Sequence, residues 1–245
     1  MQKMILEAIK SPIITADDNL ITIITKLLKK HKIYNGDIIV IASKVLAVTQ
    51  NRLKKIKNQK EFQRLVEEEA DEIIGKGRVT LTLKANIFAP WAGVDRSNVP
   101  KNHAVLWPKQ PYLVSEELLN FIKKKFQLKR AGVIIADSFC MPLRKGTGAI
   151  ALGYAGFEGV RDLRGQKDLY KKKLQFTQQA VADNLAAAAN LVMGESRESK
   201  PFALIRNAPV VFTERKIDPN SLIMEKKECL YAPFYEQKKI QAEPQ

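Results

Sequence analysis

The chain has 245 residues, enough for one large domain or two small ones, and its 45% hydrophobic and 27% charged residues are typical of a soluble globular protein. Its two cysteines exclude a disulfide framework and a cysteine-rich zinc site, so we expect the protein to work in a reducing cytoplasm. Because the chain also has only two histidines, any metal ion should be bound by oxygen ligands. The net charge of +15 would attract nucleic acid, anionic membranes or anionic small molecules. No apolar run reaches the roughly 18 residues of a membrane span, and we expect no signal peptide because the N-terminus lacks its pattern.

Helical and strand patterns alternate through the first half of the chain. The acidic start and lysine-rich end of the first helix suit its dipole, and the second helix has glycines where it should end. The expected elements are a helix over 15–32, a turn at 35–37, a buried strand over 38–48, a helix over 60–74 ended by Gly75 and Gly77, a half-exposed strand over 79–83 and a polar loop over 92–99.

The second half continues the mixture, which predicts an α/β or α+β fold. We expect a single catalytic unit over residues 1–235, with room for two subdomains whose boundary the sequence does not define, and a polar, frayed tail over 236–245. The expected elements are a helix from Ser115 to 126, a strand over 132–136, glycine-rich loops and short strands over 144–168, a helix over 176–193 whose alanines 186–189 allow close packing, and strands over 202–205 and 210–213.

Three acidic residues lie where predicted elements end. Asp95 has Ser97 and Asn98 beside it, Asp137 precedes Ser138, and Glu195 follows Gly194. Carboxylates with neighbouring hydroxyl and amide groups can form an oxygen-ligand site for Mg²⁺ or Mn²⁺ that also contacts substrate phosphates. For any one of these carboxylates taken alone, an ordinary turn or capping role is the better interpretation.

A basic, glycine-rich segment follows. Its composition resembles a phosphate-binding loop but matches neither common nucleotide motif, and a solvated basic loop is the alternative. Cys140 has no histidine near it in sequence, so a nucleophilic cysteine is disfavoured, and Trp91 and Trp107 are expected to pack rather than stack on ligands. The cationic residues that would hold an anionic substrate are Arg144, Lys145, Arg161, Arg164 and Lys167.

Five segments occur in the order seen in one enzyme family. Together they make the chain similar, over roughly residues 8–215, to the coenzyme F420-0:L-glutamate ligase family, which is also called CofE-like. The second and fifth segments are the most specific. The segments are GDIIVIAS (36–43), AGVDRSNV (92–99), GVIIADS (132–138), RDLRGQKDLY (161–170) and AVADNLAAAANLVMGE (180–195).

The resemblance implies a homodimer with the family's own α/β fold and a reaction that uses GTP and a divalent metal, Mg²⁺ or Mn²⁺, to join L-glutamate to a carboxylate of the coenzyme F420-0 precursor. It implies that the metal is bound by Asp95, Asp137, Ser138 (threonine in the family) and Glu195. It implies that GTP contacts Ser11, Pro12, Ile13, Ile14, Ser43, Lys44, Asn98 and the segment from Met193 and Gly194 to Lys200.

Two segments depart from the family pattern. After the first buried strand the family reads Ser-Lys-Ala-Glu-Gly-Arg, whereas residues 47–52 here read AVTQNR, so the lysine expected near the nucleotide phosphates is Val48. Lys44 could take its place from a different angle. After Ser138 the family commonly has Gly-Arg, whereas this chain has Cys140-Met141 and keeps Arg144. The metal ligands are therefore retained, while parts of the nucleotide and substrate contacts differ.

The expected reaction passes the γ-phosphoryl group to a carboxylate, and the amine of glutamate then displaces phosphate from the acyl phosphate. Such chemistry needs positioning and charge stabilisation rather than a nucleophilic side chain, and Arg144 and Lys167 are the predicted catalytic cations. Two alternatives stay open: a relative that acts on a different acceptor, and a non-catalytic protein that binds nucleotide or nucleic acid. The short basic runs, without interleaved aromatic residues, disfavour nucleic acid.

Overall fold

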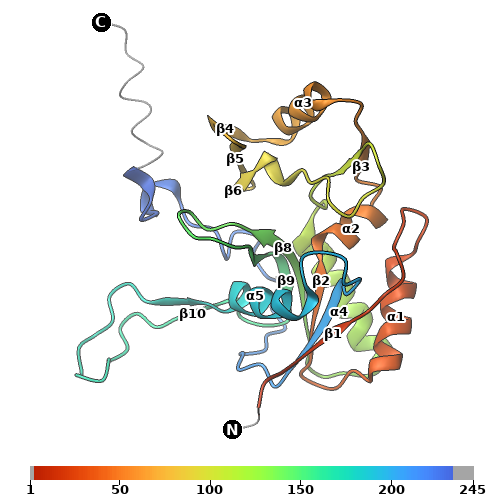
Figure 1. The fold of residues 1–245 in the computed structure, drawn as a ribbon. Coiled ribbons are helices and arrows are strands. Elements are labelled where there is room, and N and C mark those ends of the chain that lie inside the picture. Colours follow the sequence, from red (N-terminus) through yellow and green to blue (C-terminus); the bar gives the residue numbers. More distant parts are fainter. Residues whose placement is uncertain (1–2, 234–245) are drawn as a thin grey trace, which may run out of the picture.

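A five-stranded sheet forms the centre of the molecule in the computed structural model, which describes residues 3–233 (Figure 1). The strand order is β1-β12-β2-β8-β9; β2 and β8 are parallel, and every other neighbouring pair is antiparallel. β1, β2 and β8 therefore end, and β12 begins, at one end of the sheet, which we call its carboxyl end. The strands are β1 (Ile5–Ile9), β2 (Ile38–Ala42), β8 (Gly132–Phe139), β9 (Gly148–Ala155) and β12 (Phe202–Arg206).

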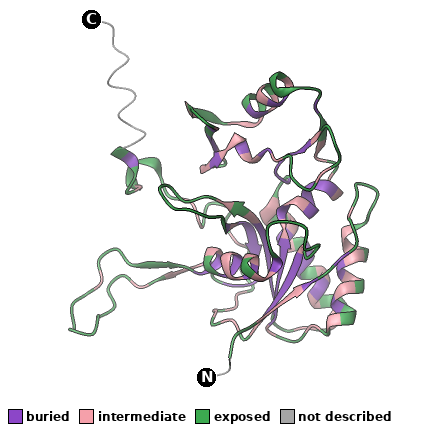
Figure 2. Cartoon of the chain, in the orientation of Figure 1, coloured by how far each residue is buried: buried purple, intermediate pink, exposed green. Residues whose placement is uncertain are grey.

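Helices cover both faces of this sheet and create a three-layer core (Figures 1 and 2). On one face, Ile24 of α1 (Leu20–His31) and Ile122 of α4 (Pro111–Phe126) join the buried cluster formed by the sheet. On the other face, α5 (Val181–Met193) packs its small buried side chains, including Ala186 and Ala189, against the strands. The predicted mixed α/β class is confirmed, and the close packing allowed by the alanines occurs within the chain.

A smaller lobe lies beyond the carboxyl end of the sheet (Figure 1). Its three-stranded sheet β4-β5-β6 and the β3-β7 pair surround a separate apolar cluster that includes Phe62, Val66 and Leu106. The lobe positions the predicted loop 92–99 above the central sheet. Its elements are α2 (Ser43–Thr49), β3 (Leu53–Lys55), α3 (Gln59–Glu69), β4 (Glu72–Lys76), β5 (Thr80–Lys84), β6 (Ile87–Pro90), the short 3-10 helix η1 (Trp91–Gly93) and β7 (His103–Val105).

Two segments project from the body. The strands β10 (Val160–Asp162) and β11 (Gln178–Ala180) pair antiparallel and carry a long exposed loop, and we call residues 160–180 the projecting hairpin (Figures 1 and 2). Because it follows β9, which runs opposite to β8, this hairpin starts from the end of the sheet opposite to the carboxyl end. The loop 140–147 between β8 and β9 projects from the carboxyl end itself. The remaining short element is the 3-10 helix η2 (Lys226–Glu228).

Several predicted boundaries in the first half were wrong. The strand expected over 38–48 stops at Ala42, and residues 43–49 form α2, because an apolar run of this length fits either a strand or a buried helix face. The helix expected over 60–74 ends at Glu69, and Gly75 lies at an irregularity inside β4 rather than ending a helix. The first helix begins at Leu20, capped by Asn19, and not at residue 15.

The second half also differs from expectation in places. Ser115 does not cap α4, which begins at Pro111; its hydroxyl donates to the Pro111 carbonyl at 2.8 Å. The glycine-rich region contains the eight-residue strand β9, where Gly153 allows close approach, since a Cβ there would lie 2.5 Å from the Pro111 carbonyl carbon. Residues 178–180 form β11 before α5 begins, and the strand expected over 210–213 is reduced to a bridge between Phe212 and Phe157. The predicted tail over 236–245 lies outside the described residues.

Across residues 3–233, we find no helix with the length and apolar character needed to cross a bilayer. The strand predicted over 132–136 is confirmed but continues to Phe139. This extension matters because β2 makes its last pairing, Ala42 with Ala136, before β8 ends. Asp137 and Ser138 consequently have β9 on one side and no strand on the other. The Asp137 side chain contacts the start of α2 and the small lobe, whereas the Ser138 hydroxyl contacts Glu195 after α5.

Candidate functional site

Four segments far apart in sequence meet at the carboxyl end of the central sheet. Residues 43 and 44 begin α2 directly after β2, and Asp137 and Ser138 lie in the extension of β8. The segment between α5 and β12 reaches the same place, because β12 begins there. The predicted N-terminal stretch joins it after β1, where the Ser11 backbone N–H donates to the Ser199 carbonyl at 2.9 Å. The topology thus gathers most of the predicted nucleotide and metal residues, as expected at strand carboxyl ends.

Asp95 is held by its backbone and by Lys44. Two backbone hydrogen bonds with Val105, 2.8 and 3.0 Å long, fix the loop that carries it. Lys44 Nζ donates to Asp95 Oδ2 at 2.6 Å, and Ser97 donates to the same carboxylate through its N–H and its hydroxyl. Burial opposes ionisation, but these donors hold the pKa of Asp95 below its ordinary value. Asp95 is therefore an anion with a cation already beside it.

Asp137 is enclosed by two donors from other segments. The Ser43 hydroxyl donates to Oδ1 at 2.5 Å, and the Trp107 indole Nε1–H donates to Oδ2 at 2.6 Å. Burial nevertheless raises the pKa of Asp137 above its ordinary value, although both hydrogen bonds favour the ionised form. Both carboxylate oxygens are oriented by rigid neighbours, which positions this side chain firmly for a further ligand.

Glu195 closes the arrangement from the other side of the sheet. The Ser138 hydroxyl lies 2.9 and 3.2 Å from the two Glu195 oxygens, and Asn190 Nδ2 donates to Oε1 at 2.6 Å. In the next turn, Asn98 Nδ2 donates to the Ser196 carbonyl at 2.9 Å and ties the Asp95 loop to this segment. These contacts connect five residues, which we call the carboxylate cluster: Lys44, Asp95, Asp137, Ser138 and Glu195.

The carboxylate cluster offers the hard oxygen donors that Mg²⁺ and Mn²⁺ prefer. Within residues 3–233, however, no three acidic, histidine or cysteine side chains converge closely enough to hold a metal ion. Each carboxylate instead accepts a hydrogen bond from a protein donor. The donor set fits the predicted metal in chemistry, and Lys44 supplies positive charge at Asp95.

Some predicted residues lie elsewhere. Arg144 is exposed in the loop 140–147, beyond the end of β8, and Lys167 lies in the projecting hairpin, which starts from the opposite end of the sheet. No hydrogen bond or ion pair found in the described part of the chain joins either to the carboxylate cluster. Ile13 is exposed in the segment after β1, and Met193, the last residue of α5, is buried in the cluster between α5 and the central sheet. Val48 is buried against Val105, so the side chain at this position packs in the lobe.

Trp107 has a polar role that the sequence reading missed, because the residue was expected only to pack. Its ring does pack with Ala89 and Leu152, and its carbonyl accepts from Arg52 Nε at 3.1 Å. Its indole N–H, in addition, orients Asp137. The indole N–H of a buried tryptophan usually has a hydrogen-bond acceptor. That rule could have predicted a polar partner for Trp107 from the sequence. Gly93 makes room for it, since a Cβ there would lie 2.2 Å from Trp107 Nε1.

Replacing Trp107 with phenylalanine should keep an aromatic ring at this position and remove the donor to Asp137. We expect metal-dependent nucleotide binding to weaken about tenfold, as for other groups that orient metal ligands, and the free energy of unfolding to fall by about 1 to 2 kcal/mol. Trp91→Phe is the matched control, because the Trp91 ring contacts Phe62 edge-on in the small lobe and not the carboxylate cluster. Calorimetric titration of both variants would show this difference, and equal nucleotide affinities would contradict the assigned role.

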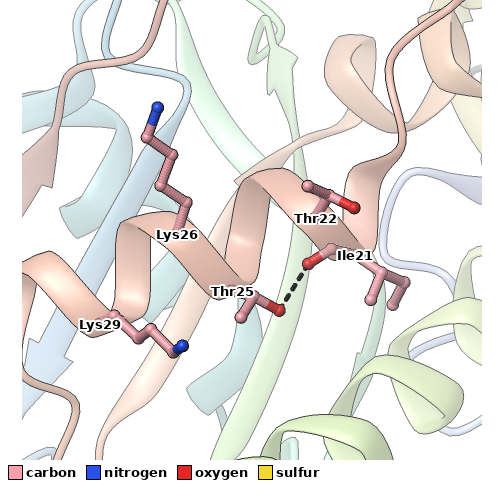
Figure 3. A pocket seen from close by; sticks show the side chains of 5 residues that line it. All are labelled: Ile21, Thr22, Thr25, Lys26 and Lys29. Atoms are coloured by element: carbon pink, nitrogen blue, oxygen red, sulfur yellow. Dashed lines mark hydrogen bonds between the residues drawn. The ribbon is translucent and has the colours of Figure 1, made fainter.

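A surface hollow on α1 is distinct from this site. It is lined by Ile21, Thr22, Thr25, Lys26 and Lys29, and the Thr25 hydroxyl donates to the Ile21 carbonyl at 2.7 Å (Figure 3). None of these residues belongs to the carboxylate cluster or to the predicted nucleotide segments. The hollow contains no carboxylate, and its polar groups are those of an ordinary helix surface.

Comparison with known proteins identifies the family to which the chain belongs. A model of the F420-0:gamma-glutamyl ligase family matches residues 8–207, a span that contains the whole carboxylate cluster. The chain belongs to this family. A coenzyme F420:L-glutamate ligase of Methanococcus maripaludis is 34% identical over 86% of this chain and 91% of its own length. The ligase of that name from Methanocaldococcus jannaschii is 35% identical over 79% of this chain and 84% of its own length. The resemblance predicted from the sequence is thereby confirmed, and the chain is a member of a ligase family.

Proposed function

We propose that this F420-0:gamma-glutamyl ligase family member joins L-glutamate to a carboxylate acceptor, coenzyme F420-0, in a reaction that uses GTP and Mg²⁺ or Mn²⁺. Its relatives are named as ligases of coenzyme F420 and L-glutamate. The observation that carries the proposal is the carboxylate cluster: Asp95, Asp137 and Glu195 come from three segments, and hydrogen bonds to partners from other segments link all three at one end of the sheet.

In the proposed reaction, an acceptor carboxylate oxygen attacks the γ-phosphorus and GDP leaves. The glutamate nitrogen then attacks the acyl carbon, phosphate leaves, and the amine proton passes to solvent. Asp95, Asp137, Ser138 and Glu195 would hold the divalent cation, which supplies charge neutralisation for the phosphates. The protein's own contribution is to hold these ligands rigidly, through Val105 at Asp95 and through Ser43 and Trp107 at Asp137.

The nucleotide would lie along the segments that converge on the carboxylate cluster. These are the stretch after β1, the start of α2, and the turn after α5, where Gly194 has a φ of +85° and Glu198 accepts from the Ser196 N–H at 2.8 Å. The loop 140–147, which starts next to Ser138, would place Arg144 near an anionic acceptor.

The test is the ligase reaction itself. Purified protein incubated with F420-0, L-glutamate, GTP and Mn²⁺ should convert F420-0 to a species heavier by one glutamyl residue, with GDP and phosphate released in equal amounts. Mass spectrometry of the product and omission of each component in turn check this. A glutamylated product that forms equally well without GTP would contradict the proposal.

We also propose that the chain forms a homodimer. The projecting hairpin exposes Leu169, Tyr170 and Phe176, which are 99%, 85% and 90% accessible, more apolar surface than a slender arm normally leaves in water. Light scattering at micromolar concentration should therefore give twice the mass of one chain. A single-chain mass under these conditions would contradict the proposal, and Leu169→Ser should lower the measured mass if this hairpin forms the contact.

A further inference from the structure

The Lys44 ammonium has the surroundings of a bound cation. Its Nζ lies 2.6 Å from Asp95 Oδ2, 2.8 Å from the Ser97 carbonyl and 2.9 Å from the Ser97 hydroxyl. Three oxygen acceptors match the three N–H donors of an ammonium group. The side chain is only 26% accessible, so this is not a loosely held surface ion pair.

The same turn of α2 reaches a second carboxylate. Ser43 donates to Asp137 Oδ1, and the positive charge of Lys44 also stabilises the ionised form of Asp137. Consecutive residues at the start of one helix therefore hold two of the carboxylates that would bind a metal. Lys44 bonds Asp95 directly and acts on Asp137 through its charge.

The other cations of the small lobe near Asp95 are committed to different partners. Arg96, the next residue after Asp95, bonds Gln59 and lies over the Phe62 ring. Arg52 and Lys84 both pair with Glu69. Among the ion pairs found in residues 3–233, the pair with Asp95 is therefore the one that places a positive charge in the carboxylate cluster, and Lys44 supplies it.

We propose that Lys44 acts as a resident cation, which occupies Asp95 while the site lacks metal and leaves it when metal enters with the nucleotide, its ammonium then pairing with a nucleotide phosphate. This inference rests on the proposed function. Two cations cannot share Asp95 Oδ2 without strong repulsion, and the flexible lysine stem allows the ammonium to move. Free metal should therefore bind weakly, because it must displace Lys44, whereas the metal–nucleotide complex offers Lys44 a new anion.

The experiment compares full-length wild type, Lys44→Met and the control Lys101→Met, in which an exposed lysine of the same lobe is removed at the same cost in charge. Calorimetry with Mn²⁺ alone should show Lys44→Met binding about tenfold more tightly than wild type, since the competing charge is gone. Calorimetry with GTP in excess Mn²⁺ should show Lys44→Met binding about tenfold more weakly, since a charged contact to phosphate is lost. Lys101→Met should match wild type in both titrations.

Two further measurements keep the test decisive. Without metal, Lys44→Met should melt at a lower temperature than wild type, because Asp95 loses its partner, and Mn²⁺ should raise its melting temperature by more than it raises that of wild type. Lys44→Arg keeps the charge at Asp95 and should bind Mn²⁺ alone as weakly as wild type. If wild type binds GTP with Mn²⁺ but Lys44→Met binds Mn²⁺ no more tightly than wild type, the proposed role of Lys44 is overturned and the proposed function is not. Failure of wild type to bind GTP with Mn²⁺ would contradict the proposed function instead.

Discussion

Asp137→Asn should reduce metal-dependent nucleotide binding by about tenfold or more, equivalent to at least about 1.4 kcal/mol, while the metal-free protein stays as stable as wild type or becomes more stable. The amide keeps the shape of the carboxylate but not its charge. It can also be satisfied in place, because its oxygen can accept from Trp107 Nε1 while the Ser43 hydroxyl turns to accept from its nitrogen.

The expected stability follows from the sign of the pKa shift. Burial raises the pKa of Asp137, so ionising this group is less favourable in the folded protein than in the unfolded chain. Such a group lowers stability at pH values above its ordinary pKa in the unfolded chain, and that cost is absent at pH values below it. Removing the charge at neutral pH therefore removes the cost. A structural carboxylate of no functional importance would leave metal binding unchanged.

Thermal melts with and without Mn²⁺ measure both effects. The control is Asp162→Asn, which removes an equal charge from an exposed pair with Arg164 in the projecting hairpin. We expect Mn²⁺ to stabilise wild type and the control equally and to stabilise Asp137→Asn much less. An unchanged Mn²⁺-induced stabilisation of Asp137→Asn would remove this residue from the metal site.

Gly93→Ala should lower the free energy of unfolding by roughly 3 kcal/mol, since it combines backbone strain with overpacking. Gly93 has a φ of +69°, which favours glycine, and a Cβ there would lie between 2.2 and 2.6 Å from atoms of the Trp107 ring. The ring must move to admit the methyl group, so its hydrogen bond to Asp137 should be lost as well. Urea denaturation measures the first effect, and calorimetric titration with Mn²⁺ and GTP measures the second.

Gly165→Ala separates the two causes. Gly165 also has a positive φ, +80°, but nothing lies within 4 Å of the position a Cβ would take. This variant carries the backbone penalty alone and should cost about 1 kcal/mol with nucleotide binding unchanged. Equal losses of stability in the two variants would show that the Trp107 contact has no special importance.

The sequence predicted three of the five central strands, β2, β8 and β12, because each is an apolar run near turn residues. It did not predict β1, and it did not define β9 within the glycine-rich region. It failed at residues 43–49, where the helix begins without a side-chain cap and the apolar run gives no period that separates helix from strand. Helix α3 was extended too far for a related reason, since Ile73 continues its apolar face although the chain has already turned into β4.

The site could be predicted as a set of segments but not as a set of contacts. The resemblance pointed to Asp95, Asp137 and Glu195, and the structure brings their segments to one end of the sheet. The partners of these carboxylates depend on the path of the chain in space: Lys44 is 51 residues from Asp95, and Trp107 is 30 residues from Asp137. No local pattern records such pairings. The distant position of Lys167 follows from the direction of β9, which the sequence did not define.

In the proposed function, the carboxylate cluster binds a divalent cation that in turn binds the nucleotide. Calorimetric titration of the purified protein with GTP, once in excess Mn²⁺ and once in excess chelator, tests this dependence on the metal. We predict tight GTP binding with Mn²⁺ and binding weaker by at least about tenfold, or about 1.4 kcal/mol, with chelator. Equal GTP affinity under the two conditions would contradict metal-dependent nucleotide binding at this site.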